Sequence, residues 1–552
     1  MSKRDHPNGE EHPELQHPSI KRAKEIDQSE TPYEQLKHAL GEQKAVDRVT
    51  HVAHWFRSKD LRIEDNTALH HASQLAQEKG VPLVTFYLMC AKEFEWHGTS
   101  PARTDFVLQA LDGMQKELKE KYNIPLVFID APDRKDKVSK VVDFLNENEI
   151  SHVFANYEYE YDELRRDIQL LDEIDDIQFS LYHDQTIVEP GTVRSVGDKP
   201  MKVFTPYHKA WLSVVKDDPS LLDTHPSPSP NDKSVLRSHS SLFETKVPSA
   251  PSNKQFASDA DRKRTRDLWP AGHAAGVARL QHFLNDKISS YAETRSNPAA
   301  DSTSRLSAYF SSGQISLRET LSAVRKHNKG SADFSSPPGI SSWVRELCFR
   351  ELYRQMLVII PHNSLNLPQN LKYDSVDWEN PYNSSKSSSS SSSPTALEKW
   401  RAWCTGQTGA PFIDAGMRQL LTESYMHNRL RMNVSSYLTH NLGLDYRLGE
   451  RFFAEHLIDW DLANNTQGWE PSYTVFNPFS QAEKNDPGGD YIRKWVPELK
   501  DLKGKEVFQP DTRCDAKQFD ALGYKKQIVE WKETKVESLD RLKEAFHGKE
   551  EQ

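Results

Sequence analysis

The sequence predicts an α/β protein of two domains: an N-terminal doubly wound domain with a mostly parallel sheet, and a C-terminal all-α domain. Between residues 49 and 190, short apolar runs alternate with amphipathic stretches of helical period, which is the pattern of βαβ units. Between residues 265 and 501, helical patterns dominate and no strand-like alternation competes with them. A chain of 552 residues is long enough to form two large cores.

Four apolar runs in the first domain predict buried strands, and two amphipathic stretches predict helices. The strands lie within residues 49–56, 81–90, 124–132 and 150–159, and the helices within residues 102–122 and 135–149. No GxGxxG or Walker lysine motif follows these strands, so an ordinary dinucleotide or nucleotide triphosphate site is not indicated.

The remaining segments divide into predicted helices of the second domain and polar connections. Helical spacing is clearest within residues 277–293, 343–360 and 412–424. We expect residues 1–48 to be a disordered tail and residues 191–264 to be an interdomain linker with one ordered element at 203–212. The polyserine run at 384–394 predicts an exposed loop, and residues 502–552 form a charged tail with one helix in 527–546.

Composition excludes several classes of protein. The four cysteines are widely spaced and form no CxxC pair, so neither a disulfide framework nor a zinc site is indicated. No apolar run approaches the ~20 residues that a membrane helix needs, and we expect no contact with a membrane. The formal charge of −10 argues against a uniformly basic surface, but nucleic-acid binding depends on where positive charge lies.

The N-terminal tail bears on location. It carries a split basic cluster typical of nuclear import, formed by Lys3, Arg4, Lys21, Arg22 and Lys24. Disordered tails are, however, often basic by chance. We therefore expect a monomeric protein of the nucleus, with mitochondrial delivery left open.

Charged side chains recur along apolar helical faces between Tyr425 and Trp469. This stretch places arginines, aspartates and asparagines among Leu, Met, Phe and Trp, and burying such groups without partners is very unfavourable. Two explanations fit: structural salt bridges, or a pocket that holds a polar ligand.

A second candidate site lies upstream, in the sequence TSRLS from Thr303 to Ser307. Hydroxyl groups and free backbone N–H groups at the start of a helix suit a diphosphate. A simple Ser/Thr helix cap explains the same residues. Tyr291, twelve residues before Thr303, belongs to the same pattern, YAETRSNPAADSTSRLS.

Together these motifs resemble a known family. MHNRLRM from Met426, GER from Gly449 and DWDLANNTQGW from Asp459 look like the flavin-binding helical domain of the photolyase and cryptochrome family. The nearest branch is the class I group, of fungal type, that repairs cyclobutane pyrimidine dimers in DNA. The resemblance covers most of the chain between Val49 and Leu499.

The resemblance assigns an FAD site to the helical domain. It implies that the FAD phosphates and ribityl chain are held by Tyr291, Thr303, Ser304, Arg305, Leu306 and Ser307. It further implies that Asp459 and Asp461 face the ribityl chain and ring edge, that Arg431 neutralises Asp459, and that Asn465 lies at flavin N5. A neutral amide at N5 accepts or donates a hydrogen bond without supplying a proton, which favours an anionic reduced flavin. Trp343 and Trp460 complete this expected pocket.

The resemblance also implies an antenna chromophore. WFRSKDLRIEDNTAL from Trp55 and ANYEYEYDELRRD from Ala155 are similar to the family's antenna-domain motifs, and His97 and Glu163 would contact 5,10-methenyltetrahydrofolate. Alternatively, Glu163 pairs with a neighbouring arginine on its helix. Leu365 stands where some members offer a lysine to the folate tail, so the identity of the antenna stays open.

Ultraviolet-damaged DNA would be the substrate, and its lesion must flip out of the duplex to reach a buried flavin. Phosphate contacts would come from Arg295, Arg350, Arg429 and Gln481, and aromatic faces from Trp343 and Phe349. Glu346 would hydrogen-bond the thymine carbonyl edge once protonated or through a water, and Asn428 and Met432 would complete the floor. The (6-4) branch would place more histidines in MHNRLRM than the single His427, which favours a cyclobutane dimer.

Two departures keep a second function open. The family's chain of three electron-carrying tryptophans is matched by Trp469, Tyr446 and Trp378, and the middle tyrosine is harder to oxidise unless another aromatic, such as Trp460, takes over. The loop after Trp469 is also shortened, and Phe349 replaces a tryptophan. A blue-light sensor that keeps FAD but repairs poorly is the alternative to a lyase, and a non-catalytic DNA-binding protein is a third. Plain core aromatics would explain the same three residues.

Overall fold

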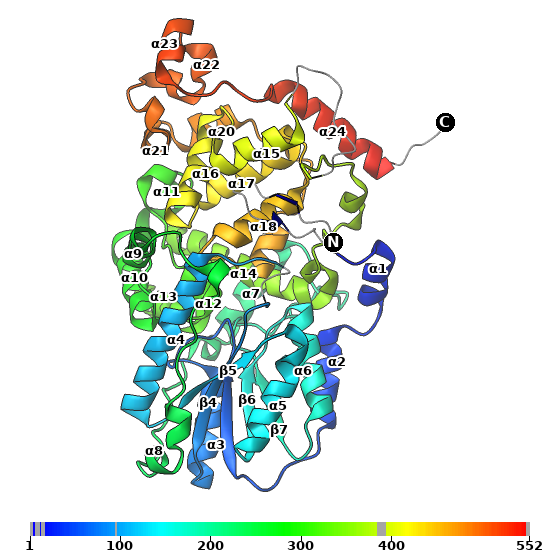
Figure 1. The fold of residues 1–552 in the computed structure, drawn as a ribbon, viewed down its shortest axis with the longest axis vertical. Coiled ribbons are helices and arrows are strands. Elements are labelled where there is room, and N and C mark those ends of the chain that lie inside the picture. Colours follow the sequence, from blue (N-terminus) through cyan, green and yellow to red (C-terminus); the bar gives the residue numbers. More distant parts are fainter. Residues whose placement is uncertain (1–3, 6–10, 13–16, 94–96, 383–393, 548–552) are drawn as a thin grey trace.

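The structure is a computed structural model that describes residues 4–5, 11–12, 17–93, 97–382 and 394–547. Its two main parts follow each other along the long axis: the sheet and its helices lie at one end, and the helical domain lies at the other (Figure 1). The predicted two-part architecture is confirmed.

Five strands form one all-parallel sheet in the order β5-β4-β3-β6-β7. Their bounds are His51–Phe56 (β3), Leu83–Cys90 (β4), Leu126–Ala131 (β5), Ile150–Asn156 (β6) and Gln178–Tyr182 (β7). The sequence predicted the first four. It missed β7, an edge strand whose sequence QFSLY has only Phe179 buried and so lacks an apolar run.

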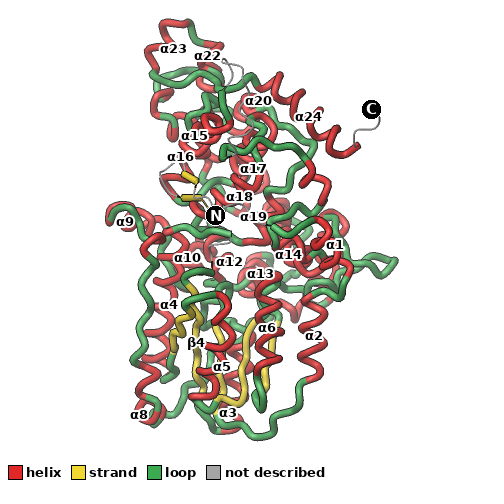
Figure 2. Tube along the Cα trace, turned by 45° about the vertical axis from the view of Figure 1, so that its right-hand side comes forward, coloured by secondary structure: helices red, strands yellow, loops and turns green. Residues whose placement is uncertain are grey.

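Helices cover both faces of this sheet (Figure 2). They are α3 (Thr67–Lys79), α4 (Pro101–Tyr122), α5 (Lys137–Glu147) and α6 (Tyr161–Glu173). Because β4 and β5 lie on one side of β3 while β6 and β7 lie on the other, the strand order reverses between β3 and β6. A crevice at the carboxyl ends of these two strands is the usual place for a ligand in such a sheet.

The connection between the domains runs beside the α/β domain and includes α7 (Phe204–Asp217), α8 (Val235–Ser238) and α9 (Asp259–Leu268). The side chain of Asn231 pairs with both backbone groups of Leu83, at 2.9 and 2.8 Å, and so fastens the connection to β4. The expected element at 203–212 is α7, which packs against the longest helix of the second domain.

The second domain is helical throughout its described residues. Its helices are α10 (His273–Asp286), α11 (Tyr291–Thr294), α12 (Ser307–Ser312), α13 (Leu317–His327), α14 (Pro338–Ile359), α15 (Ala396–Thr405), α16 (Pro411–Glu423), α17 (Asn428–Ser436), α18 (Tyr446–His456), α19 (Leu462–Gly468), α20 (Pro478–Asn485) and α21 (Asp490–Trp495). The 22-residue α14 contacts α7, α11 and α19, so residues far apart in sequence meet along it. A π-helical turn, Tyr437–Asn441, follows α17.

The two ends of the chain differ from the expected tails. Residues 20–42 form α1 (Ile20–Gln28) and α2 (Pro32–Glu42), in which Tyr33 and Leu36 are buried. The disordered tail predicted for residues 1–48 is therefore wrong over this stretch. A capping box at Thr31 followed by Pro32 starts α2, and the apolar side chains then pack on α6. Two short strands, β1 (Arg4–Asp5) and β2 (Glu11–His12), precede α1.

The C-terminal segment continues through α22 (Pro510–Arg513) and α23 (Ala516–Leu522) to α24 (Trp531–His547), which matches the helix predicted in 527–546. Leu542 of α24 is fully buried. The polyserine prediction at 384–394 lies outside the described residues, apart from Pro394. Within the described part of the chain, no helix is both long and apolar enough to cross a bilayer.

Candidate functional site

The loop that precedes α12 brings the predicted phosphate-binding residues together. Arg305 adopts a left-handed backbone conformation, with φ of 51°, between Ser304 and the buried Leu306. Its guanidinium is anchored by Asp301 at 3.2 Å and by Glu423 at 3.6 Å. The buried hydroxyl of Ser302 has no hydrogen-bond partner among the described residues, so this loop has an unused polar group to offer a ligand.

Tyr425 connects this loop to the predicted acidic side of the pocket, a role that the sequence analysis missed. The guanidinium carbons of Arg305 and Arg431 each lie 5.4 Å from its ring centroid. Arg431 donates from Nη2 to Oδ2 of Asp459 at 2.7 Å, which confirms the predicted pairing. The other oxygen of Asp459, Oδ1, is buried without a described partner. This oxygen can accept a hydrogen bond from a ligand hydroxyl group.

A second buried ion pair holds Asp461. Arg354 donates from Nη2 to Oδ2 of Asp461 at 2.5 Å and from Nη1 to Oδ1 of Asn464 at 2.8 Å. Burial would raise the pKa of Asp461, but Arg354 and further cations lower it to about 2. Next to it, Asn465 donates to the backbone oxygen of Glu450 at 2.9 Å. The sequence analysis missed Arg354, although an arginine inside the apolar run from Trp343 to Ile360 was a visible signal.

These observations test whether the residues present fit FAD. The site offers hydroxyl groups and an arginine on the phosphate side, a free carboxylate oxygen of Asp459 in the middle, and the amide of Asn465 beyond it. Polar groups of these kinds match a diphosphate, a ribityl chain and a ring edge, so the residues fit the cofactor.

Most residues predicted to bind DNA gather next to this pocket. Glu346 on α14 forms an ion pair with Arg295, and Arg429 donates to Oγ of Ser296 at 3.0 Å. Asn428 and Met432 are exposed on α17, and Gln481 lies on α20, which packs against α17. The site therefore combines two partly exposed arginines with one carboxylate.

A pocket opens at the carboxyl ends of β3 and β6, where the reversal of the strand order predicts a crevice. It is lined by residues that follow these strands, by α5 and α6, and by the helical domain: Arg57, Lys59, Glu93, His97, Arg103, Lys137, Glu158, Glu160, Glu163, Arg166, Ser364, Trp460 and Asp461, among others. Both predicted antenna residues are in this lining. The ring centroids of His97 and Trp460 lie 6.3 Å apart.

Charge in this pocket is nearly balanced. Lys59 pairs with Glu160, and Arg166 pairs with Glu158 at 3.2 Å and with Asp167 at 2.9 Å. Burial would raise the pKa of Glu163, but Lys137 and other cations hold it below its ordinary value. Burial lowers the pKa of His97 to about 3, so its ring is neutral at physiological pH. Arg166 is thus engaged by two other carboxylates, and Glu163 faces the pocket.

Comparison with known proteins agrees with this geometry. A family model described as DNA photolyase matches residues 52–231, and one described as the FAD binding domain of DNA photolyase matches residues 343–544. The deoxyribodipyrimidine photo-lyase of Neurospora crassa is 36% identical over 541 residues, covering 93% of this chain and 85% of that protein. This chain belongs to the DNA photolyase family.

Solved structures extend the likeness to the whole fold. A class III photolyase from Agrobacterium tumefaciens superposes with a TM-score of 0.73 at 25% identity, covering 91% of this chain and 99% of the other. A cryptochrome from Synechocystis superposes with a TM-score of 0.68 at 23% identity, covering 90% of this chain and 99% of the other, which indicates the common fold alone. The helical half of this photolyase-family protein is thus an FAD-binding domain.

Three of the family-based assignments do not match the structure. Arg350 is buried and donates to the backbone oxygens of Gln185, at 2.5 Å, and Phe310, at 3.1 Å, so it does not reach a DNA phosphate. The ring of Phe349 stacks on Phe204, with centroids 3.4 Å apart, so that face cannot hold a pyrimidine. Both differences arise from the packing of α14: Arg350 bonds to Gln185 and to Phe310 of α12, and Phe349 packs on Phe204 of α7.

The third difference is Trp343, whose indole is buried with its centroid 4.7 Å from that of Phe283. Phe283 also contacts Tyr291, so Trp343 supports the wall that carries Tyr291 and offers no open face to a lesion. Its predicted place in the cofactor pocket is consistent with this position, whereas the predicted stacking on a pyrimidine is not.

The predicted electron-transfer residues share one hydrophobic cluster. Trp469 packs so closely on α18 that a Cβ at Gly449 would lie 2.2 Å from its ring. Tyr446 begins α18, and Trp378 precedes Glu379, whose backbone pairs with Gly443 and Asp445. Trp460, the suggested substitute for Tyr446, belongs to the same cluster and also lines the pocket beside His97.

Proposed function

We propose that this protein uses light to split cyclobutane pyrimidine dimers in DNA, with FAD in the helical domain. The observation that carries the proposal is the continuity of the site: the phosphate loop at Arg305 and the Arg431–Asp459 pair adjoin through Tyr425, and Tyr291 interacts with Tyr425 and with the Arg295–Glu346 pair. The deoxyribodipyrimidine photo-lyases that this chain resembles carry the same activity in their name.

Each part of the site has a separate task. When bound and excited by light, reduced FAD supplies the electron that opens the dimer. The loop from Thr303 to Ser307 and Tyr291 would hold the phosphates, Asp459 would accept from the ribityl chain, and Asn465 would lie at N5 without supplying a proton. Asp461 stays ionised because Arg354 is paired with it.

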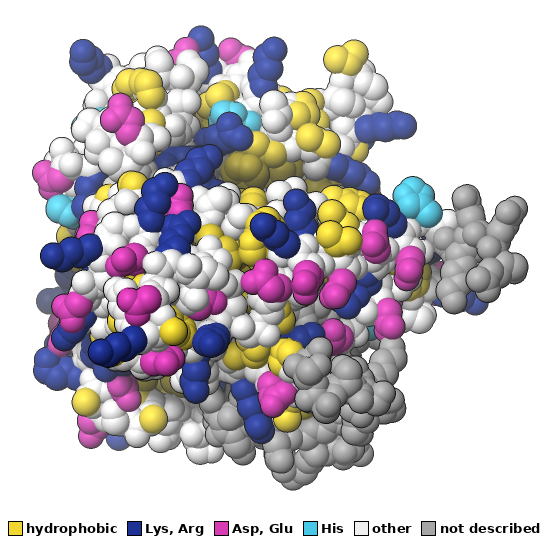
Figure 3. All heavy atoms as spheres, turned by 90° about the horizontal axis from the view of Figure 1, so that it is seen from above, with side chains coloured by type: hydrophobic (Ala, Val, Ile, Leu, Met, Phe, Trp, Pro, Cys, Tyr) yellow, Lys and Arg dark blue, Asp and Glu magenta, His cyan; other side chains and the backbone are white. Residues whose placement is uncertain are grey.

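The substrate face suits a flipped-out dinucleotide. Arg295 and Arg429 place positive charge where flanking phosphates can bind, which a protein of net charge −10 needs to do locally. Seen from the end of the helical domain, Lys and Arg side chains border a recess with a hydrophobic floor (Figure 3). Once protonated, or through a bridging water, Glu346 would exchange its ion pair with Arg295 for a hydrogen bond to the thymine carbonyl edge.

The pocket at the sheet edge would hold the antenna, for which we propose 5,10-methenyltetrahydrofolate. Glu163 is a suitable acceptor for the amino group and ring N–H of a pterin, and the neutral His97 and Trp460 supply flat apolar surfaces. Leu365 offers no charge to the folate tail, so arginines and lysines of the pocket lining would have to bind it.

A blue-light sensor is the second candidate, and two observations favour it. The loop after Trp469 is shortened, and Glu470 at its start accepts from the backbone of Gln369 and Asn370 and so is held in place. Phe349, which would stack on the lesion, is occupied by Phe204. A sensor would bind FAD and respond to light without restoring thymines.

Repair itself decides between the two functions. Purified, chemically reduced protein is incubated with an oligonucleotide that carries one cyclobutane thymine dimer, in blue light and in darkness, and restored thymines are quantified. Restoration only in light supports the lyase. No restoration, with FAD bound and responsive to light, makes the sensor the better conclusion.

A matched pair of variants tests the placing of the lesion. Glu346→Ala removes a hydrogen bond of charged type and should slow repair by about 10- to 100-fold with FAD retained. Glu293→Ala, at an exposed position on α11, should repair at the normal rate. Equal rates for the two variants would show that the lesion lies elsewhere.

We also propose a nuclear location and a monomeric state. Lys21, Arg22 and Lys24 are exposed on α1, although their helical conformation is not the extended one expected for a tail. Replacing all three with alanine should shift a fluorescent fusion out of the nucleus, and an unchanged distribution would remove this cluster as the signal.

A further inference from the structure

Three tryptophan side chains and one tyrosine form a continuous path from the flavin side of the helical domain toward its surface. The ring centroids of Trp469 and Trp403 lie 6.2 Å apart, and those of Trp403 and Trp400 lie 5.5 Å apart with nearly parallel planes. Nε1 of Trp400 then donates to the phenolic oxygen of Tyr382 at 3.1 Å. Trp400 and Trp403 are fully buried, whereas Tyr382 is half-buried.

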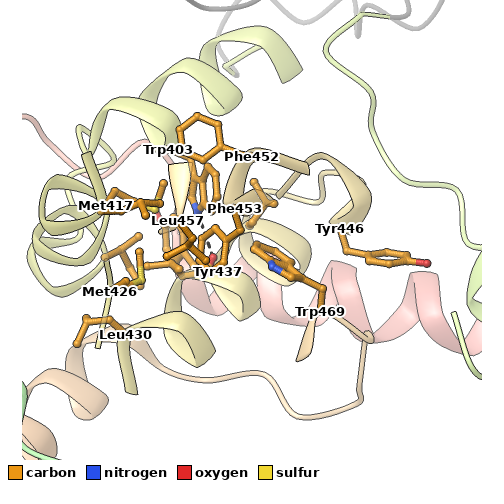
Figure 4. Packing of buried hydrophobic residues seen from close by; sticks show 14 of the residues in the cluster. Trp403, Met417, Met426, Leu430, Tyr437, Tyr446, Phe452, Phe453, Leu457 and Trp469 are labelled. Carbon is orange, nitrogen blue, oxygen red and sulfur yellow. Dashed lines mark hydrogen bonds between the residues drawn. The ribbon is translucent and has the colours of Figure 1, made fainter. Parts of the chain in front are cut away.

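The packing around this path excludes water. Phe452 and Phe453 of α18 lie edge-on to the indoles: Phe452 is 5.7 Å from Trp400, and Phe453 is 4.9 Å from Trp469. Nε1 of Trp403 is fixed by the backbone oxygen of Val434 at 3.0 Å. Trp403, Phe453 and Trp469 form one group in the core (Figure 4). Their rings are therefore held in place.

The route expected from the family is less favourable in this chain. Tyr446 is buried, and its hydroxyl has no hydrogen-bond partner among the described residues. Its phenol points away from Trp469 (Figure 4). Neither Tyr446 nor Trp378 has a ring contact with another aromatic side chain within the described chain. Oxidising a phenol without a group that takes its proton is difficult, so Tyr446 is a poor carrier.

We propose that Trp403, Trp400 and Tyr382 carry electrons to Trp469 when the oxidised flavin of this protein is reduced in light. This rests on the proposed function, because Trp469 is taken as the residue next to the flavin. Trp469 would give one electron to the excited flavin. The resulting electron hole would then move from Trp469 through Trp403 and Trp400 to Tyr382. Tyr382 gives up one electron from its phenol and releases the phenolic proton to solvent.

The cycle is completed by a reductant from solution. A thiol transfers one electron and one proton to oxidised Tyr382 and is itself oxidised to a thiyl radical, which pairs to a disulfide. The net result is one electron moved from the thiol to the flavin for each photon used. Tyr382 suits the terminal position because its side chain is half-buried, whereas the two indoles before it have no access to solvent.

The test compares two pairs of conservative variants of the full-length holoprotein with FAD bound and oxidised. Trp400→Phe and Tyr382→Phe interrupt the proposed path, and Tyr446→Phe and Trp378→Phe interrupt the family route. Flavin reduction is followed by absorbance in blue light with dithiothreitol. We expect the first pair of variants to reduce the flavin about tenfold or more slowly than the wild type, which corresponds to a modest rise in the barrier. The second pair should reduce it at near the wild-type rate.

A second measurement identifies the radical. Electron paramagnetic resonance on samples frozen during illumination should show a tyrosyl signal in the wild type and a tryptophanyl signal in Tyr382→Phe. This change tests the path even if Trp400→Phe packs poorly. A wild-type rate in Trp400→Phe and Tyr382→Phe, together with a large loss in Tyr446→Phe or Trp378→Phe, would overturn the proposal.

The test of the electron path can be separated from the test of the repair activity. Chemically reduced protein no longer needs the path, so Trp400→Phe should repair a thymine dimer at the wild-type rate after reduction with dithionite. Failure of every chemically reduced protein to repair would reject the lyase, and the photoreduction rates and radical signals would still decide the path.

Discussion

Removing one partner of the buried Arg354–Asp461 pair should be among the single changes that most lower the stability of the helical domain. The two side chains are 2% and 3% exposed, so neither charge has access to water. In Arg354→Met, the carboxylate loses its main counter-charge and stays in a low-dielectric interior. Breaking such a pair from one side costs about 3–5 kcal/mol of unfolding free energy, a large share of the stability of an ordinary domain.

The pH dependence gives an independent estimate of the same interaction. Arg354 and further cations hold the pKa of Asp461 at about 2, below its ordinary value of 3.8. Because the folded-state pKa is depressed, the stabilisation is present above about pH 4 and is lost as pH falls toward 2, with a magnitude of about 2 kcal/mol. In Arg354→Met, burial instead favours the neutral acid, so the variant should lose stability as pH rises above about 4.

Urea unfolding followed by tryptophan fluorescence measures both effects at pH 7 and pH 4. The control is Arg262→Met, which breaks the exposed pair between Arg262 and Asp259 and should change the free energy of unfolding by less than about 1 kcal/mol. If Arg354→Met lost no more than this control at pH 7, the pair would not be the buried interaction that the structure shows. A loss equal at both pH values would point to packing rather than charge.

Three further predictions concern the cofactors and the C-terminal helix. Glu163→Gln should lower the absorbance of a bound folate relative to that of FAD, and an unchanged ratio would place the antenna elsewhere. Asn465→Asp should change which redox state of the flavin is stable in air, since a carboxyl group at N5 can supply a proton; an identical spectrum would remove Asn465 from that position. Leu542→Ala should cost about 2–5 kcal/mol because the side chain is fully buried, whereas Val536→Ala, at an exposed position on α24, should be near neutral. Equal melting temperatures of the two variants would show that α24 is not docked.

The sequence by itself determined the layout of the chain. Apolar runs of strand length and stretches of helical period located four of the five strands of the parallel sheet and the long helices. The order of apolar and polar residues along the chain is a local property, so it can be read from the sequence. The Arg431–Asp459 pair was expected only from the resemblance to the photolyase and cryptochrome family, because the two residues lie in separate motifs, and the structure contains this pair.

Tertiary structure alone decided which faces the side chains present. Arg350 and Phe349 lie in a helical run that predicts only a helix. The side chain of Arg350 is held by Gln185 and Phe310, and one face of Phe349 is covered by Phe204 of α7. Residues 20–42 were polar enough to suggest disorder, yet two helix caps and a few apolar side chains dock them on the folded domains.

The aromatic path shows the same limit most clearly. Trp400 and Trp403 lie three residues apart on α15, so their contact is local to one helix, whereas the contact between Trp403 and Trp469 arises only where α15 meets the end of α19. Local pattern gives the period and polarity of each element, whereas contacts between elements depend on how side chains of particular shape fill a shared interior.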